Sequence, residues 1–300
     1  MMKTTPKSSQ STVFQVESPD TLLNFLLEHV KNKSRNTVKG FLSKRQVKVG
    51  SKTVTAFDYA LKPGQTVTIL PPADQRAPKL PFPVIYEDAD LIVIDKPAGL
   101  LTVATDRERD KTAYRILTDY LAGPGKEKPL FIVHRLDRDT SGVVLFAKNQ
   151  EMKEALQEDW EDLVDRRVYL AAVEGRPPEE RGTVKSFLRE TSTHLVYSGA
   201  PGNGAREAVT HYEVLARGTG CTLLSVALDT GRKNQIRVHM QDLGCPVLGD
   251  KKYGGRAGDM GRLGLHAREL AITDPRTGKQ AVYTAPAPKE FRKLFPEALG

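Results

Sequence analysis

The sequence is organised around the stretch FIVHRLDRDTSGVVLFAK, residues 131–148. Its ends, residues 131–133 and 143–147, are short apolar runs rich in β-branched and aromatic side chains, which is typical of buried strands. The polar residues between them, 134–142, predict a loop held at the edge of a core, where functional side chains concentrate. This loop carries two carboxylates, two guanidinium groups, one imidazole and two hydroxyl groups. It is our first candidate for a catalytic loop, and a solvated turn with internal ion pairs is the alternative.

The composition is that of a globular protein with one large or two ordinary domains. Of the 300 residues, 39% are hydrophobic and 27% are charged. No apolar stretch approaches the roughly 20 residues that span a bilayer, and residues 1–12 lack the apolar core of a secretory signal. We therefore expect a cytoplasmic protein with a disordered tail over residues 1–12. Cys221 and Cys245 have no disulfide or metal-ligand spacing, so we expect reduced thiols and no metal.

The net charge of +8 is concentrated at one end of the chain. Residues 1–80 contain 13 Lys and Arg against 5 Asp and Glu, whereas the rest of the chain is neutral overall. A basic module attached to a neutral body predicts a polyanionic partner, most simply a nucleic acid.

Residues 13–70 are expected to form this basic module as a separate domain. Apolar residues at helical spacing predict a first helix over 21–30, with Ser18 or Asp20 able to cap its start. A second helix is expected over 36–43. This helix would bring Arg35, Lys39 and Lys44 near one another.

The same domain is expected to continue with short strands and to end at a linker. Alternating residues around a Gly-Ser turn predict a hairpin over 47–54, and a Pro-Gly turn at 63–64 leads into another strand. Residues 71–83 contain five prolines and no core-forming pattern, which predicts a stiff, extended linker. A larger domain then occupies residues 84–300.

The loop sequence HRLDRDTSG, residues 134–142, resembles the signature of the RluA-like RNA pseudouridine synthases. Further stretches resemble other motifs of that family. They are 86–100 (YEDADLIVIDKPAGL), 167–175 (RVYLAAVEG), 205–215 (AREAVTHYEVL) and 230–254, which begins TGRKNQIRVH and ends GDKKYG. The resemblance therefore recurs along the larger domain.

The chain departs from the family pattern at three places. Residues 101–104, Leu-Thr-Val-Ala, stand where the family often has Val-His-Pro, and Arg167 stands in the place of a Lys. Lys233 and Asn234 replace a Thr-His pair. No role of that histidine is carried over to this chain.

Residues 13–70 resemble the small αL RNA-binding domain that is named after a ribosomal small-subunit protein. The match rests on Ser34-Arg35, on the strand with Val47 and Val49, and on the turn at 61–64, whereas the usual Arg-Leu-Asp start of the first helix is replaced by Thr-Leu-Leu-Asn. The resemblance implies a basic helix–turn face that binds RNA. The residues that would form this face are Arg35, Lys39, Lys44 and Arg45. A solvated basic face without a partner is the alternative.

The resemblance implies an α+β fold and a reaction. The catalytic domain would be a mixed, largely antiparallel sheet of the pseudouridine synthase type, preceded by the small αL RNA-binding domain. Pseudouridine formation breaks the bond between ribose and N1 of uracil, turns the base and rejoins it through C5, so no cofactor is expected. One carboxylate must act as nucleophile or base, and the family motif assigns it to Asp137. Arg237, expected on a strand over 235–239, would pair with Asp137 and favour its ionised form.

Three more residues are candidate substrate-binding residues. The resemblance implies that Tyr169 stacks on the target uracil, an interaction worth roughly 1–3 kcal/mol. It also implies that Arg135 fills the gap that the extruded uridine leaves in the RNA, with an ion pair to Asp139 as the alternative. His134 is expected to orient the loop by a hydrogen bond. Trp160, on a helix expected over 150–160, is assigned to core packing.

Other functions remain open at this point. A non-catalytic RNA-binding or ribosome-assembly factor would need the basic domain but not Asp137. A hydrolase using Ser141 would need a G-x-S-x-G elbow, which the chain lacks, so Ser141 is assigned to a turn. A metal-dependent polynucleotide hydrolase would need more acids than Asp137 and Asp139. We expect a monomer that acts on structured RNA, with ribosomal RNA as the first choice and tRNA as the alternative.

Overall fold

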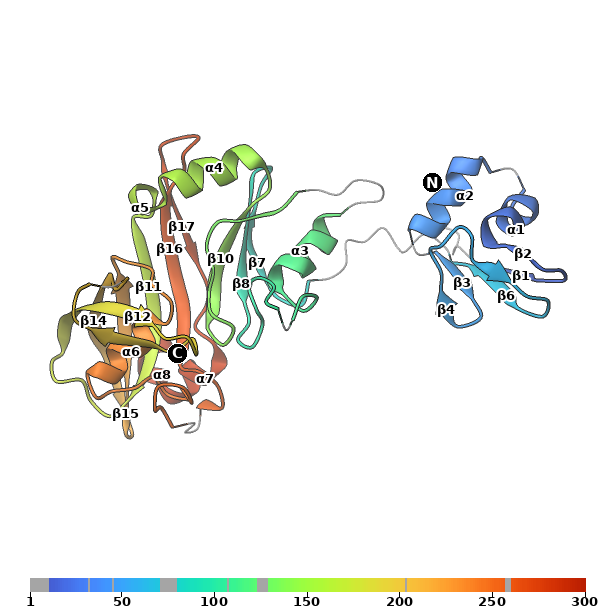
Figure 1. Ribbon diagram of the computed structural model, residues 1–300. Coiled ribbons are helices and arrows are strands. Elements are labelled where there is room, and N and C mark those ends of the chain that lie inside the picture. The colour runs from blue at the N-terminus through green and yellow to red at the C-terminus, as the bar shows by residue number, and fades with distance from the viewer. Residues whose placement is uncertain are drawn as a thin grey trace, which may run out of the picture. The chain divides into compact units, whose positions relative to one another are not determined.

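The computed structural model describes residues 11–31, 33–44, 46–70, 80–106, 108–122, 129–202, 204–256 and 260–300. These residues form two compact units with separate cores, unit 1 before residue 71 and unit 2 from Leu80 onward (Figure 1). Residues 1–10 of the expected tail, residues 71–79 of the expected linker and Arg45 lie outside the described residues.

Unit 1 combines two helices with small antiparallel sheets. The helices are α1 (Leu22–His29) and α2 (Arg35–Ser43). One sheet has the strand order β1-β6-β3-β4, and β2 pairs with β5. The strands are β1 (Thr12–Gln15), β2 (Asp20–Thr21), β3 (Val47–Val49), β4 (Lys52–Thr53), β5 (Ala60–Leu61) and β6 (Thr66–Ile69). Leu26 and Leu42 on the helices pack with Val47 and Val67 on the strands to form its core.

The two helices of unit 1 begin differently. Ser34 caps α2, because its hydroxyl accepts a hydrogen bond from the backbone N–H of Thr37 at 3.3 Å. The expected cap of α1 by Ser18 or Asp20 is wrong. The N-cap is Thr21, which makes no side-chain cap bond, and Asp20 Oδ1 accepts from the N–H of Thr21 itself.

Unit 2 is built on one 11-stranded sheet with the order β13-β12-β14-β15-β11-β16-β10-β8-β7. β17 pairs with β16, and β9 pairs with β10. Among the described strands only β10 and β16 run parallel, so the expected mixed, largely antiparallel α+β fold is confirmed. The strands are β7 (Val84–Glu87), β8 (Leu91–Lys96), β9 (Phe131–Ile132), β10 (Ser141–Ala147), β11 (Arg166–Glu174), β12 (Arg181–Glu190), β13 (Val196–Gly199), β14 (Arg206–Gly218), β15 (Cys221–Leu228), β16 (Leu265–Thr273) and β17 (Gln280–Thr284).

The apolar runs of β8 and β10 are buried on both faces of the sheet. Successive strand residues point to opposite faces, and here they enter two different cores. Helix α3 (Ala113–Leu121) packs on one face through Leu117, and helix α4 (Gln150–Glu158) packs on the other through Leu156. This double burial explains why both strands are continuously apolar rather than alternating.

The parallel pairing of β10 with β16 requires Gly142. Its φ is +113°, a conformation that other residues rarely adopt. A Cβ atom at this position would lie 2.1 Å from the carbonyl oxygen of Ala267. The glycine that closes the 134–142 loop therefore allows the loop to enter the sheet directly beside β16.

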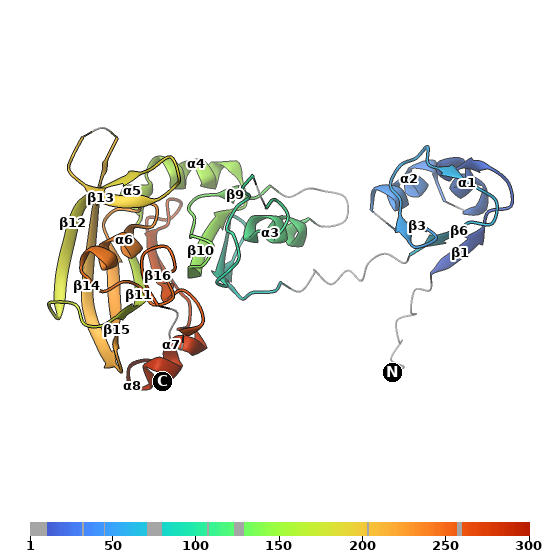
Figure 2. The same cartoon turned by 60° about the horizontal axis from the view of Figure 1, so that its bottom comes forward.

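Helix α6 (Gln235–Asp242) occupies the segment that was expected to be a strand over 235–239, and that expectation is wrong. Ile236, Val238 and Met240 alternate as in a strand, but Ile236 and Met240 pack as an i, i+4 helical pair into one core while Val238 enters another. Figure 2 shows α6 lying against β14. Arg237 therefore projects from the first turn of a helix.

The remaining helices are α5 (Trp160–Leu163), α7 (Lys289–Leu294) and α8 (Pro296–Leu299). Phe291 of α7 packs on Leu170 and Leu223 at the C-terminal end of the chain. Phe82, in the last part of the expected linker, is only 6% exposed and lies in the core under α3. None of the described helices has the length and hydrophobicity required to cross a bilayer.

Candidate active site

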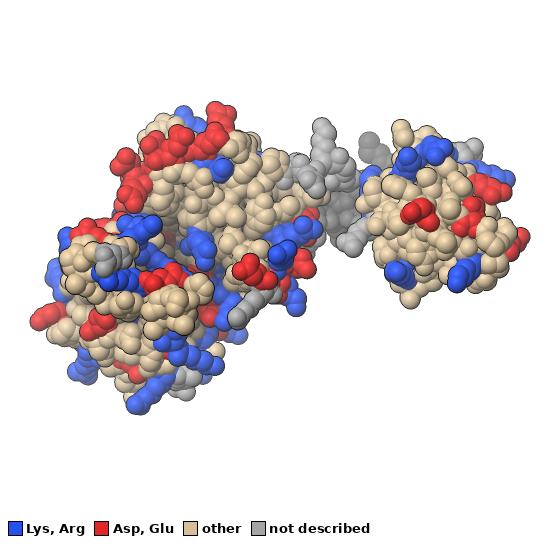
Figure 3. All heavy atoms as spheres, in the orientation of Figure 1, with Lys and Arg blue, Asp and Glu red and all other residues tan. Residues whose placement is uncertain are grey.

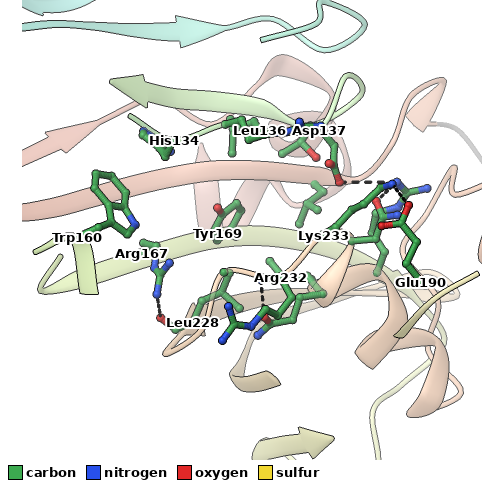
Figure 4. A pocket seen from close by; sticks show the side chains of 18 residues that line it. His134, Leu136, Asp137, Trp160, Arg167, Tyr169, Glu190, Leu228, Arg232 and Lys233 are labelled. Atoms are coloured by element: carbon green, nitrogen blue, oxygen red, sulfur yellow. Dashed lines mark hydrogen bonds and ion pairs between the residues drawn. The ribbon is translucent and has the colours of Figure 1, made fainter. Parts of the chain in front are cut away.

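A cavity of about 540 Å³ opens where the 134–140 loop, β11 and the segment from Leu228 to Arg237 meet (Figure 4). Asp137, Lys233 and Glu190 lie towards one end, His134, Trp160 and Arg167 towards the other, and Tyr169 between them. The cavity thus collects side chains that are far apart in the sequence.

The backbone on either side of Asp137 is held by the segment that follows β8. The hydroxyl of Thr102 donates to the carbonyl of Leu136 at 2.7 Å and accepts from its N–H at 3.2 Å. The carbonyl of Arg138 accepts from the N–H of Gly99 at 2.9 Å and from Nζ of Lys96 at 3.1 Å. Both peptide neighbours of Asp137 are therefore fixed before any RNA binds.

Lys96 is a buried cation with a structural task. It is 0% exposed, and its Nζ also donates to the carbonyls of Pro97 at 3.0 Å and Leu100 at 2.7 Å. Burial lowers the pKa of Lys96 to about 7. Three carbonyl acceptors match the three hydrogens of the ammonium form. In this form Lys96 links the segment that follows β8 to Arg138 in the 134–140 loop.

Asp137 lies beside Arg237, but the main partner of Arg237 is another carboxylate. Asp137 Oδ2 is 3.9 Å from Nη1 of Arg237. Nε and Nη2 of Arg237 donate to the two carboxylate oxygens of Asp250 at 2.6 and 2.7 Å. Burial alone would lower the pKa of Arg237, but the hydrogen bonds and charge of Asp250 outweigh it and raise that pKa above its ordinary value. Sequence reasoning missed Asp250, although it lies in the GDKKYG motif.

Tyr169 on β11 presents a neutral ring to the middle of the cavity. Burial raises the pKa of Tyr169 to about 12, so the phenol stays protonated at neutral pH. The ring is partly buried between the cores on either side of the cavity. It is therefore placed to offer an apolar surface to a base.

His134 is a neutral hydrogen-bond acceptor. Its Nε2 accepts from the N–H of Leu145 at 3.0 Å, and burial lowers the pKa of His134 to about 4. Its ring stacks on that of Trp160 with centroids 5.0 Å apart. Trp160 packs partly on the core, as expected, but it begins α5 instead of continuing the helix expected over 150–160. It also lines the cavity, which the sequence did not predict.

Four further charged residues line the cavity and were not predicted as site residues: Arg167, Glu190, Arg232 and Lys233. Arg167 on β11 donates to the carbonyl of Asp229 at 2.8 Å, and burial lowers its pKa. Glu190, at the end of β12, accepts hydrogen bonds from Lys233 and from His194, and these bonds hold the pKa of Glu190 below its ordinary value. The only sequence signals were the places of Arg167 and Lys233 in family motifs.

The remaining loop residues are arranged differently from the expectations. Arg135 is exposed at the cavity and forms no ion pair within the described residues; Asp139 pairs instead with Arg138 at 3.2 Å. Ser141 is not a turn residue but the buried first residue of β10. Its hydroxyl bonds to Nδ1 of His266 at 2.8 Å and accepts from Arg262, and it does not line the cavity.

The candidate RNA-binding residues of unit 1 are on its surface. Arg35 and Lys39 on α2 and Lys44 at its C-cap are exposed. Nζ of Lys39 lies 5.7 Å from the centre of the Phe57 ring, which is itself 44% exposed. On the face that Figure 3 shows, the lysine and arginine side chains of unit 1 form separate groups rather than one continuous patch.

Comparisons with known proteins agree on one family. The model of the family described as RNA pseudouridylate synthase matches residues 90–242. The chain is 32% identical to the uncharacterized RNA pseudouridine synthase YlyB of Bacillus subtilis, over 95% of this chain and 96% of that protein. It is 29% identical to ribosomal large subunit pseudouridine synthase D of Nitrosomonas europaea, over 96% of this chain and 88% of that protein.

A solved structure supports the same grouping. The human protein named RNA pseudouridylate synthase domain containing 4 superposes with a TM-score of 0.57 and 27% identity, over 69% of this chain and 89% of that chain. The fold, the family model and the relatives thus agree. The chain belongs to the RNA pseudouridylate synthase family, and it is an RNA pseudouridine synthase, an isomerase.

Proposed function

We propose that this enzyme isomerises uridines in ribosomal RNA and that Asp137 is its catalytic carboxylate. The observation that supports Asp137 most directly is its position in the cavity, 3.9 Å from a guanidinium and on a loop whose backbone is fixed on both sides. The Asp137 side chain is 28% exposed, so it is open to a ligand in the cavity. Ser141, the other nucleophile considered, is buried behind the loop.

The reaction needs one carboxylate and no external reagent. The bond between C1′ of ribose and N1 of uracil breaks, a bond between C1′ and C5 forms, and the proton on C5 leaves while N1 gains one. Asp137 serves as nucleophile at the sugar or as base. Arg237 places a positive charge 3.9 Å from this carboxylate. Atoms balance without a cofactor, and we propose that the enzyme uses none.

The other site residues bind and orient the RNA. Tyr169 stacks on the target uracil, and its neutral ring suits this role. Arg135, exposed and without an ion pair within the described chain, fills the gap in the RNA stack. His134 orients the loop by accepting from the backbone of β10. Each role uses a side chain that lines the same cavity.

Unit 1 is proposed to be an αL-type RNA-binding domain. Its exposed cations Arg35, Lys39 and Lys44, with Phe57 beside Lys39, supply charge and an aromatic surface for RNA. Arg45 is assigned to the same face by its sequence position alone. Ribosomal RNA is favoured as target because two relatives are named ribosomal large subunit pseudouridine synthase D, and tRNA is the alternative. The buried, unpaired thiols of Cys221 and Cys245 suit the reducing cytoplasm. We also propose that the enzyme is a monomer.

The target is tested by mapping pseudouridine in total RNA from cells with and without the gene. We expect one or a few sites in large-subunit ribosomal RNA to disappear and to return with the wild-type gene but not with Asp137→Asn. Loss of sites only in tRNA would replace the ribosomal target by the alternative. Restoration by Asp137→Asn would overturn the role of Asp137.

A further inference from the structure

Arg237 uses most of its donors on partners other than Asp137. A guanidinium carries five N–H donors in a fixed plane. Nε and Nη2 are taken by Asp250, and Nη1 donates to Oδ1 of Asn234 at 2.8 Å. Nη1 is also the atom that approaches Asp137. Asp250 therefore fixes one edge of the guanidinium, and Asn234 fixes the nitrogen that faces Asp137.

The Asp250 edge is itself rigid. Asp250 is 1% exposed, and its Oδ1 also accepts from the N–H groups of Lys252 and Tyr253, both at 3.1 Å. The ring of Tyr253 lies under the guanidinium, 4.9 Å from Cζ of Arg237. Because the guanidinium is one rigid plane, the Asp250 edge and the Tyr253 ring leave mainly a tilt of that plane about the held edge, which would move Nη1. The hydrogen bond from Nη1 to Asn234 restrains this tilt.

Asn234 is suited to hold Nη1 in both conformation and chemistry. Its φ of 56° and ψ of 17° place it in the left-handed region at the N-cap of α6, which Asn tolerates better than most residues. Its Nδ2 donates to the hydroxyl of Tyr253 at 3.2 Å while its Oδ1 accepts from Arg237. The side chain is 8% exposed, so both ends of the amide are used internally.

We infer that Asn234 is a positioning residue for catalysis: it holds Nη1 of Arg237 towards Asp137 and acts on the reaction only through Arg237. Asn234 stands where the family motif has a histidine, so this chain builds the contact with its own residue. A carboxamide can accept from Arg237 and donate to Tyr253 at the same time. The inference rests on the roles of Asp137 and Arg237 proposed above. It requires no contact between Asn234 and RNA.

The test compares two substitutions in the full chain. Asn234→Gly keeps the left-handed backbone but removes the acceptor, whereas Asn234→Asp keeps the acceptor, loses the donor to Tyr253 and adds a negative charge beside Arg237. The readout is the single-turnover release of tritium from C5 of uridine at pH 8, with a transcript that carries the mapped target. Filter binding gives the RNA affinity, and thermal unfolding confirms that each variant is folded.

We expect Asn234→Gly to slow the single-turnover step about 10- to 100-fold, because a small misplacement of a catalytic neighbour has effects of that size. RNA affinity should stay within about twofold, and Asn234→Asp should recover most of the rate. A normal rate for Asn234→Gly would overturn the inference. So would equal losses in both variants, or a loss of RNA affinity that matches the loss of rate.

A second comparison separates this inference from the site assignment. Arg237→Lys keeps a positive charge for the buried Asp250 but offers one nitrogen in place of the three that bond to Asp250 and Asn234. It should be slow, and adding Asn234→Gly to it should change the rate by less than about threefold, since residues that act through one another are not additive. A fast Arg237→Lys would overturn the proposed role of Arg237. If the Arg237→Lys enzyme is slow and Asn234→Gly slows it further by the same factor as it slows the wild type, only the role of Asn234 is overturned.

Discussion

The hydroxyl of Thr102 bonds to both the carbonyl and the N–H of Leu136, the residue directly before Asp137. Thr102 is 2% exposed and Leu136 is 6% exposed, so water cannot replace these bonds. The two residues lie 34 positions apart in the sequence. The segment after β8 therefore acts as the support on which the 134–140 loop is built.

Thr102→Val should destabilise unit 2 and slow catalysis. Valine has nearly the same shape but leaves the N–H and carbonyl of Leu136 without partners, which costs about 1–3 kcal/mol for a buried group. Urea unfolding should show this loss, and the single-turnover rate should fall more than RNA affinity. Thr102→Ser, which keeps the hydroxyl, is the matched control. A Thr102→Val variant as stable as the wild type would show that the hydroxyl bonds contribute nothing.

Tyr169→Leu should weaken productive binding of the target uridine. The lost stacking of about 1–3 kcal/mol corresponds to a drop of roughly 5- to 150-fold in kcat/KM. Tyr169→Phe keeps the ring, and it should retain far more activity than the Leu variant. If Phe and Leu were equally impaired, the phenol rather than the ring would be the group that matters.

The free energy of unfolding of unit 2 should fall as the pH is lowered from 6.5 towards 4. His266 is 0% exposed and burial lowers its pKa to about 4, whereas an unfolded histidine titrates near 6.5. Between these values the unfolded state binds more protons, so stability is full above pH 6.5 and is lost on acidification. Over the whole range this one histidine contributes on the order of 3 kcal/mol.

The fluorescence of Trp160, the one tryptophan of the chain, reports urea unfolding of unit 2 in this experiment. His266→Gln should reduce the dependence on pH, and the partly buried His134, whose pKa is also lowered to about 4, accounts for part of what remains. His194→Gln is the control, because the His194 side chain is 79% exposed. An unfolding free energy that stays constant between pH 7 and pH 5 would contradict the buried, neutral state of His266.

Removal of residues 1–79 should weaken RNA binding and reduce its dependence on salt. Unit 2 has its own cores, so the truncated chain should fold. Every phosphate that the truncated chain no longer binds should lower the slope of log affinity against log salt by about 0.7 to 0.9. Arg35→Gln and Lys39→Gln in the full chain should each lower the salt slope by about 0.7 to 0.9, the value for one phosphate contact. A truncated chain with an unchanged salt slope would rule out unit 1 as the RNA-binding domain.

The parts of the fold that could be predicted were those with local signals. The continuous apolar runs of β8 and β10 predicted strands that are buried, and Gly142 marked the end of the loop between β9 and β10. The strand expected over 235–239 was wrong, because Ile236, Val238 and Met240 alternate in sequence while tertiary packing makes the segment helical.

The site could be predicted only where the sequence matches the family motifs. Asp137, Tyr169 and Arg237 do line one cavity. The partner of Arg237 could not be predicted, since Asp250 reaches it only through the turn that follows α6. Thr102 and Asn234 stand where the chain departs from the family pattern, so the motifs gave no signal for the hydrogen bonds that they make.

The most direct test of the central claim is the single-turnover rate of Asp137→Asn, measured beside its RNA affinity. The substitution removes one charge at nearly constant volume, so folding and RNA binding should remain close to those of the wild type. Tritium release from C5 of the target uridine should be abolished. Release at the wild-type rate by a folded, RNA-bound Asp137→Asn enzyme would contradict the assignment of Asp137 as the catalytic carboxylate.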